Sequence, residues 1–465
     1  MVRQDGQSWA AVEFGQAQLG DPRRTKRLVR LAEQRAQQPT ASFAQGCGGA
    51  AGAKAAYRFF DNKNVTPEAV LESHRRATVA RMAQYPVVLL PQDTTQVDYS
   101  THTDTAGLGV LQSERQRGLL LHTTLAVTPE RVPLGVIDQQ IWTRDPAELG
   151  KRHRIKQRSI DEKESRKWLD SLAQVQRVQA QLPQVQLVSI ADREGDVYDF
   201  LRPVLGNGPA VLVRAIRDRR VNEPQRHLWA HLSRQPLAGR LTIQVPRAPQ
   251  QPAHAAALDV RFAAVSVRPP KARRGEQLPE LHLWAVLAHE ATPPAGRPPI
   301  EWLLLSTLPV LSFEQACQRV DWYTCRWLDE IYHKVLKSGC RIEARQLEHI
   351  DNLKRYLALD GVVAWQVLYL TMIGRQRPDA PCTIVLEPAQ WQALYCFTQQ
   401  VATPPAQPPT LRQATRWIAQ LGGFLGRKAD AHPGVTTLWR GLQRLHDITY
   451  MWQLINPAPK DVGND

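Results

Sequence analysis

Helical spacing near residue 330 relates four reactive side chains: Tyr323, Arg326, Glu330 and Lys337. Their separations of three, four and seven residues predict one stripe along a single helix. A carboxylate beside a guanidinium and an ammonium suits metal binding by Glu330 and phosphate binding by Arg326 and Lys337. Lys334, one turn after Glu330, adds another cation. The alternative is a solvated helix face with ordinary ion pairs between turns.

Two aspartates upstream favour the active-site interpretation. Asp93 follows the apolar run 86–90, and Asp192 follows the apolar run 185–191; both runs are typical of buried strands. We expect both acids at strand ends, pointing into a crevice. With Glu330 they form an acidic triad of the kind that holds two divalent metals for phosphodiester cleavage. Taken singly, each aspartate is also typical of a turn.

Glu194 and Asp196 are competing acids close to Asp192. Asp192 ends the predicted strand, so we expect the other two to be turn residues or to support the ligands from outside the site.

These motifs resemble the DDE transposases of bacterial insertion sequences, in the subclass with a Y-R-E-K helix. Within that family, the chain is most similar to the cut-and-paste enzymes of composite transposons that carry kanamycin resistance. The likeness continues in further short segments at 19–25, 56–59, 161–165, 302–305, 351–353 and 421–424. The family implies a ribonuclease-H-like catalytic core, which the residue pattern alone only suggests.

The predicted fold is α/β, with helical domains on both sides of the catalytic core. We expect a helical N-terminal DNA-binding domain over 1–66 and a ribonuclease-H-like catalytic domain over 67–378. Short apolar runs separated by Pro-rich and Arg-rich loops predict a β-rich insertion at about 218–299. Residues 379–465 are expected to form a helical C-terminal dimerisation domain.

A basic helix is predicted to begin at Asp21 and Pro22, a favourable N-cap and first-turn pair. Its basic residues are Arg23, Arg24, Lys26, Arg27, Arg30 and Arg35. Composition alone is consistent with a DNA-facing helix or with a solvated amphipathic face. The resemblance favours recognition of the transposon end, with Arg23, Arg24 and Arg27 as DNA contacts.

Within the catalytic domain, the runs 118–124 and 132–138 predict a hairpin, and 161–180 predicts a helix. A strand over 210–215 ends in a basic cluster that begins at Arg214, which we expect to contact DNA. Trp302 opens a further strand, where a tryptophan usually belongs to the core. Its separation from Tyr323 matches the family's tryptophan that stacks on a flipped-out base beside the cleavage site.

The C-terminal block contains predicted helices over 411–421 and 436–454, and apolar residues recur at helical spacing in the second. They are Leu438, Leu442, Leu445 and Ile448. This stripe is consistent with packing inside the domain, whereas the family likeness implies that the last helix pairs two subunits in the DNA complex.

Composition agrees with a nucleic-acid partner. The 465 residues carry a formal charge of +15, with an isoelectric point of about 9.8. The six cysteines show no C-x2-C pairing, which argues against zinc and against secretion. The most apolar stretch, around 362–373, is predicted to be a buried helix and not a membrane span. We therefore expect a cytoplasmic, nucleoid-associated bacterial protein without a membrane partner.

The predicted chemistry is metal-dependent. Clustered carboxylates repel one another, so Asp93, Asp192 and Glu330 should need cations, and oxygen-only ligation indicates two Mg²⁺ ions, with Mn²⁺ as a substitute. The partners would be double-stranded transposon-end and target DNA, bound by a homodimer. A nuclease of the same fold would share the triad without needing the two flanking domains. A DNA-binding regulator would need neither the triad nor the helix motif.

Overall fold

The computed structural model describes residues 7–148, 163–202, 208–245, 252–427, 430 and 432–457. Its strands and their bounds are β1 (Val87–Asp98), β2 (Gly109–Val110), β3 (Arg117–Val127), β4 (Pro133–Trp142), β5 (Gln186–Ala191), β6 (Ala210–Arg214), β7 (Gly239–Val245), β8 (His254–Val267), β9 (Leu281–Glu290) and β10 (Glu301–Ser306). The helices are α1 (Trp9–Phe14), α2 (Pro22–Gln37), α3 (Phe43–Gly46), α4 (Ala50–Phe60), α5 (Pro67–Met82), α7 (Arg166–Gln181), α8 (Tyr198–Leu201), α9 (Leu228–Ser233), α10 (Phe313–Thr324), α11 (Trp327–Lys334), α12 (Ile350–Gln376), α13 (Pro388–Gln399), α14 (Leu411–Leu421) and α15 (Val435–Ile455).

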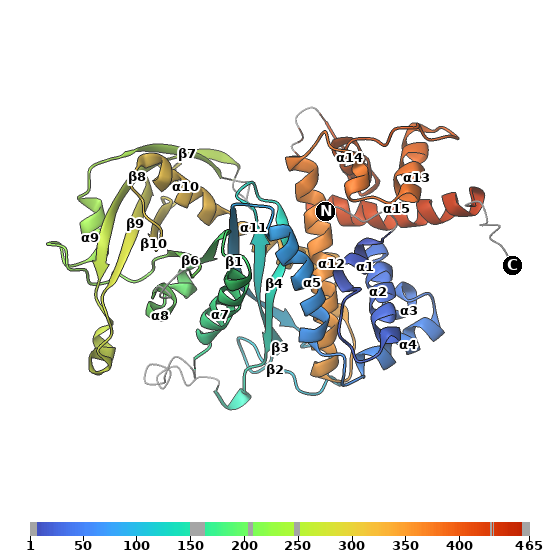
Figure 1. Ribbon diagram of the computed structural model, residues 1–465, viewed down its shortest axis with the longest axis horizontal. Helices are drawn as coiled ribbons and strands as arrows, with labels where there is room; N and C mark the ends of the chain where they lie inside the picture. The colour runs from blue at the N-terminus through green and yellow to red at the C-terminus, as the bar shows by residue number, and fades with distance from the viewer. Residues whose placement is uncertain are drawn as a thin grey trace.

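One mixed sheet runs through the centre of the molecule (Figure 1). Its strand order is β2-β3-β1-β5-β6-β10-β9-β8-β7, with β4 paired to β3. β1, β5 and β6 are parallel neighbours, whereas β3 and β10 run antiparallel on either side of them. The carboxyl ends of the three parallel strands therefore meet at one edge of the sheet, which is where ligands bind in many α/β proteins.

The predicted hairpin is confirmed as β3 and β4, which pair antiparallel. The predicted insertion contributes β7, β8 and β9, which continue the same sheet beyond β10. In β7, half-buried and exposed residues alternate, as expected for a strand with one solvated face. The predicted helix over 161–180 is α7; its first two predicted residues lie outside the described residues.

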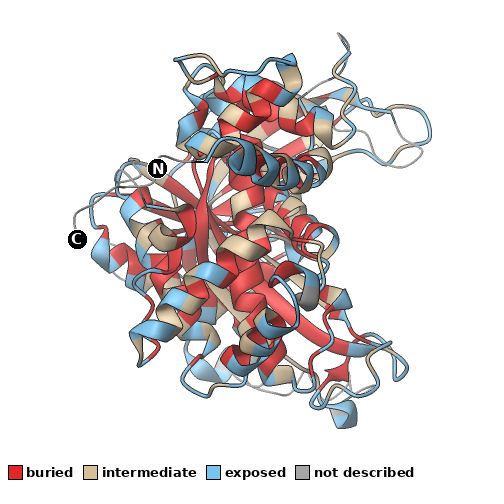
Figure 2. Cartoon of the chain, turned by 90° about the vertical axis from the view of Figure 1, so that its right-hand side faces the viewer, coloured by how far each residue is buried: buried red, intermediate tan, exposed pale blue. Residues whose placement is uncertain are grey.

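Helices α1 to α5 and α12 to α15 gather at the β4 side of the sheet (Figure 1). Their inward faces join the sheet in a band of buried residues, while their outer faces are exposed (Figure 2). The predicted buried helix around 362–373 is confirmed as part of α12. This helix is long and apolar enough to cross a membrane, but 94% of its most apolar window is buried against other parts of the structure.

The C-terminal helices predicted over 411–421 and 436–454 are confirmed as α14 and α15. Helix α13 was not predicted from the sequence. A capping box marks its start, because Glu387 accepts a hydrogen bond from the backbone of Gln390, and the Gln390 side chain accepts one in return.

Helix α2 confirms the predicted basic helix, including the Asp21 cap and the proline in its first turn. Arg35, however, does not face solvent. It follows Leu28 and Leu31 along the buried face, and its Nε atom lies 3.2 Å from Oδ1 of Asp360 in α12. Arg35 therefore anchors α2 to the core and is not available for DNA.

A buried network fixes α1 to α5. His74 Nδ1 lies 2.6 Å from Glu13, and His74 Nε2 accepts a hydrogen bond of 2.9 Å from the backbone N–H of Val136. The ring proton therefore belongs to Nδ1, so His74 is neutral. Burial holds its pKa below the usual range. Arg81 completes the network by donating two hydrogen bonds to Glu13.

The neutral state of His74 predicts a loss of stability in mild acid. An unfolded histidine binds a proton below about pH 6.5, whereas folded His74 does not, so the unfolding free energy should fall as the pH drops below that value. This contribution is about 1.4 kcal/mol per pH unit. His74→Gln can keep both hydrogen bonds without titrating. Denaturant unfolding of this variant between pH 7 and 5 should give a dependence of the unfolding free energy on pH that is weaker than in the wild type by about that amount. An unchanged pH dependence would contradict the assignment.

Candidate active site

The stripe predicted on one helix is divided among three segments. Helix α10 ends at Thr324 and α11 begins at Trp327, while 325–329 contains backbone hydrogen bonds to residues three positions earlier. A π-helix then spans Val335–Gly339. The prediction of a single continuous helix was wrong because these tighter and wider turns replace regular helical bonds.

Lys337 lies within the π-helix, where the wider turn alters side-chain direction relative to Glu330. Its Nζ atom is 3.5 Å from Oε1 of Glu343, which also accepts a hydrogen bond from the backbone N–H of Asp98 at the end of β1. Lys337 and Arg341 line a cavity of about 570 Å³ there. Lys334 is exposed.

Asp93 lies inside β1, not at the end of a strand as predicted. The parallel pairing of β1 with β5 extends to Pro91 and Ile190, but its antiparallel pairing with β3 continues to Asp98. One neighbouring strand therefore ends while the other keeps β1 extended. Continued by two residues, the parallel register brings Asp93 beside Asp192, which follows β5 as predicted.

The Arg326 guanidinium joins two predicted catalytic residues. Its Nη1 atom is 3.6 Å from Oδ2 of Asp93, and its Nη2 atom donates a hydrogen bond of 2.8 Å to Oε1 of Glu330. Burial raises the pKa of Asp93 to about 6; Arg326 opposes the shift, and the charges of Asp192 and Glu330 add to it. The structure thus brings the three predicted acids into one electrostatic cluster.

The donor chemistry of this cluster suits a divalent cation, because it offers carboxylate oxygens that repel one another. Asp192 also accepts a hydrogen bond of 2.8 Å from the backbone N–H of Glu194. Within the described ranges, no three Asp, Glu, His or Cys side chains form a ready metal centre. Arg326 supplies the positive charge between Asp93 and Glu330 instead.

Asp329 is a neighbour of the site that was not predicted from the sequence. It is fully buried, and neither carboxyl oxygen has a hydrogen-bond partner among the described residues. Burial, together with the nearby charge of Asp93, raises its pKa well above the usual range. Cys325, Tyr332 and Leu336 are also buried, so helical periodicity through 325, 329, 332 and 336 could have predicted this burial.

Tyr323 and Trp302 form an aromatic pair beside Arg326. Their ring centroids are 5.6 Å apart in an edge-to-face arrangement. Tyr323 is buried, while Trp302 is half-buried and packs against the same apolar cluster. Trp302 therefore contacts the core, as a tryptophan at a strand start usually does, yet keeps part of its ring accessible.

The predicted DNA-binding arginines differ in their exposure and in the contacts that they already make within the protein. Arg23 is exposed and pairs with Asp21, whereas Arg24 donates a hydrogen bond to the backbone carbonyl of Leu19. Arg27 is half-buried, while Lys26 and Arg30, four residues apart, are both exposed. Across the sheet, Arg214 donates a hydrogen bond of 2.9 Å to the carbonyl of Glu301.

Helix α15 carries two different apolar surfaces. Leu438 and Leu445 of the predicted stripe are buried in the protein's own core, and Leu442 and Ile448 are half-buried, so this stripe serves packing within the chain. The end of the helix instead exposes a patch of Tyr450, Met451, Leu454 and Ile455, which are 54–73% exposed.

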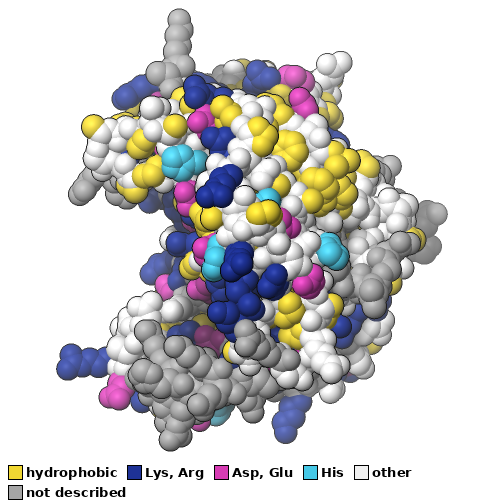
Figure 3. All heavy atoms as spheres, turned by 90° about the vertical axis from the view of Figure 1, so that its left-hand side faces the viewer, with side chains coloured by type: hydrophobic (Ala, Val, Ile, Leu, Met, Phe, Trp, Pro, Cys, Tyr) yellow, Lys and Arg dark blue, Asp and Glu magenta, His cyan; other side chains and the backbone are white. Residues whose placement is uncertain are grey.

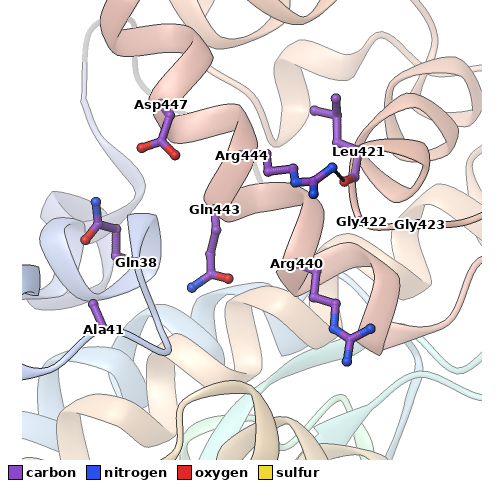
Figure 4. Close-up of a pocket in the computed structure, with 9 residues that line it drawn as sticks. All are labelled: Gln38, Ala41, Leu421, Gly422, Gly423, Arg440, Gln443, Arg444 and Asp447. Atoms are coloured by element: carbon purple, nitrogen blue, oxygen red, sulfur yellow. Dashed lines mark hydrogen bonds between the residues drawn. The ribbon is translucent and has the colours of Figure 1, made fainter.

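A cavity of about 540 Å³ separates α15 from the loop after α2 (Figure 4). Arg440, Gln443, Arg444 and Asp447 line it from the helix, and Gln38 and Ala41 line it from the loop. Gln443 also donates a hydrogen bond to Thr40. The N-terminal and C-terminal helical regions are therefore in direct contact.

Comparison with protein families agrees with both ends of this architecture. A family model described as Transposase DNA-binding matches residues 6–65, which include α1, α2 and α4. A second, described as Transposase Tn5 dimerisation domain, matches residues 362–450. The two matches support a Tn5-like transposase. They also support DNA binding and homodimer formation.

Arg326→Gln should destabilise the protein at pH 7 by about 1–3 kcal/mol, because Asp93 and Glu330 lose their shared counter-cation. The loss should be smaller at pH 5, where Asp93 is mostly protonated, since its pKa is about 6. Lys334→Gln, on the exposed side of α11, is the matched control and should change stability by less than about 0.5 kcal/mol. Equal denaturant midpoints for the two variants would refute this role.

Proposed function

We propose that this protein is a DDE transposase that cleaves transposon ends and transfers the freed strands by a cut-and-paste route. The observation that carries the proposal is the convergence of Asp93, Asp192 and Glu330 on the Arg326 cluster, in a chain whose two ends match transposase domains. The enzyme would act on DNA in the bacterial cytoplasm. Within the family, it would belong to the Y-R-E-K subclass, near the enzymes of kanamycin-resistance transposons.

We assign β4-β3-β1-β5-β6 to a ribonuclease-H-like core. The assignment is supported by three antiparallel strands that lead into two further strands parallel to β1, with α7 packed against β4 and β5. This arrangement brings Asp93, in β1, beside Asp192, directly after the neighbouring strand β5, although the two lie 99 residues apart in the chain.

Asp93, Asp192 and Glu330 would hold two Mg²⁺ ions, which Mn²⁺ could replace. Bound ions of this kind activate water and stabilise the departing 3′ oxygen. The residues themselves supply positioning and charge. Arg326 can exchange a carboxylate for a phosphate oxygen, because its fork of N–H donors suits both anions. Tyr323 would donate its O–H to a phosphate, and Lys334 and Lys337 would neutralise the DNA backbone nearby.

Joining two strands in a hairpin at the transposon end requires severe distortion of the DNA. Trp302 would support such a step by stacking on a base that has left the helix, since its half-buried indole keeps part of its surface accessible. Tyr323, packed against that ring in an edge-to-face arrangement, would hold the indole in place.

The deciding experiment uses linear DNA carrying the inverted repeats that flank the gene. Purified protein should nick and excise it when Mg²⁺ is added and bind without cleaving in EDTA. Asp93→Ala, Asp192→Ala and Glu330→Ala should each reduce nicking by at least about 10³-fold, since the metal site needs all three acids. End binding, measured by gel shift, should persist. Normal cleavage by one variant would remove that residue from the site.

The exposed pair Lys26 and Arg30 should contribute phosphate contacts. Replacing both with glutamine should reduce the slope of log affinity against log salt concentration by about 1.8, which corresponds to two phosphate contacts. Arg412→Gln, an exposed arginine on α14, is the control and should leave the slope unchanged. If the double variant kept the full slope, this face of α2 would lie in solvent.

The exposed patch at the end of α15 should form part of the dimer interface. Leu454→Ser with Ile455→Ser should weaken dimerisation on end DNA by more than roughly tenfold, because two buried apolar side chains would be lost from the interface. Light scattering of the protein–DNA complex measures the change. Gln453→Ser, directly before the two positions and also exposed, should leave the dimer intact. Dimers of undiminished strength in the double variant would place the interface elsewhere.

A further inference from the structure

A buried carboxylate fixes the loop that follows β6. Asp196 is 1% exposed, and its Oδ2 atom accepts hydrogen bonds of 2.9 Å from the backbone N–H groups of both Ile216 and Arg217. Its Oδ1 atom accepts two more from the buried guanidinium of Arg219. The Asp196 backbone carbonyl accepts a further one from Arg219. Residues 216–219 are thus held to the turn after Asp192 by five hydrogen bonds.

The fixed loop exposes an apolar side chain. Ile216 is 56% exposed, although its neighbour Ala215 is buried. A single exposed apolar residue is ordinary on a protein surface. Ile216 differs because its backbone N–H and that of Arg217 both donate to the buried carboxylate of Asp196. These hydrogen bonds fix the loop in the conformation that exposes the Ile216 side chain.

Strand register brings Ile216 to the proposed site. Arg214, the last residue of β6, pairs with Leu304 of β10, and the N–H of Ala215 donates to the carbonyl of Leu303. Continued by one more residue, this register brings Ile216 opposite Trp302. On the other side of β6, Ala191 pairs with Val213, which brings Asp192 beside Arg214. Ile216 therefore lies two residues after the position next to Asp192, on the side of β6 where Trp302 follows in the register.

The surroundings of Ile216 favour DNA as the occupant. Arg217 is exposed, and Arg214 and Arg220 are partly exposed in the same segment. Lys and Arg side chains gather on the face of the molecule formed by this β-rich side (Figure 3). Cations attract phosphates, while an apolar side chain has no favourable partner on the backbone and instead contacts bases.

We propose that Ile216 is an apolar wedge that contacts the DNA bases beside the cleaved phosphodiester, and that Asp196 is the positioning residue that holds it there. The inference rests on the proposed transposase function. Apolar side chains that enter a base step unstack it. Ile216 would thus open the base step from one side, and Trp302 of β10 would stack on the displaced base.

The test uses end DNA with 2-aminopurine at the positions next to the cut, since this base becomes brighter when it is unstacked. Ile216→Ala should bind DNA within about twofold of wild type but lose most of the fluorescence increase. It should slow second-strand cleavage roughly tenfold, with first-strand nicking unchanged. Ile216→Met retains an apolar side chain and should restore both signals. Leu311→Ala, at another exposed apolar residue, is the control.

Asp196→Asn tests the positioning role. Hydrogen exchange of the peptide 214–220 should accelerate, and the same two DNA signals should fall, while Ile216→Ala leaves that exchange unchanged. Wild-type fluorescence and cleavage in Ile216→Ala would overturn the wedge, as would equal losses of these two signals in the Ala and Met variants. Unchanged exchange in Asp196→Asn would overturn the positioning role. Failure of the wild type to bind or nick end DNA would instead refute the proposed function itself.

Discussion

The site depends on the ion pairs that the Arg326 guanidinium makes with two carboxylates. It lies at the break between α10 and α11, close enough to pair with both Asp93 of β1 and Glu330 of α11. Without a cation between them, a strand and a helix that each present a carboxylate would repel one another. Because these are ion pairs, their partners can be exchanged: a phosphate can replace the carboxylates on Arg326, and a metal ion can replace Arg326 between the carboxylates.

This arrangement explains why the helix break matters. In a regular helix, Tyr323, Arg326 and Glu330 would follow one stripe, as their spacing predicted. The tighter turn at 325–329 gives Arg326 its own orientation, and the π-helix gives Lys337 a partner at the far end of β1. One short motif therefore supplies two separate groups of contacts, one at the acids and the other near the cavity at residues 337–346.

Sequence patterns predicted the helices and strands better than the pairing of strands and the partners of buried charged residues. Alternating or continuous apolar runs identified the β3–β4 hairpin, β5 and β6, because burial on a sheet leaves a direct trace in composition. Periodicity alone did not reveal that β1 continues past Asp93, since that extension depends on pairing with β3, more than twenty residues further along the chain. Arg35 and Asp329 show the same limit. Each is a charged residue on a buried face, and only its partner or its surroundings distinguish it from a solvated one.

Helix α12 has a consequence for how the protein can be divided. It packs against α2, α5 and β4 and also against α14 and α15, and Asp360 near its middle binds Arg35. The dimerisation match begins at residue 362, inside this helix. The segments that sequence comparison separates are therefore not separate folding units. A fragment cut at that boundary would begin with half a helix and leave the buried Arg35–Asp360 pair on a severed end, so the two terminal regions are best studied in the intact chain.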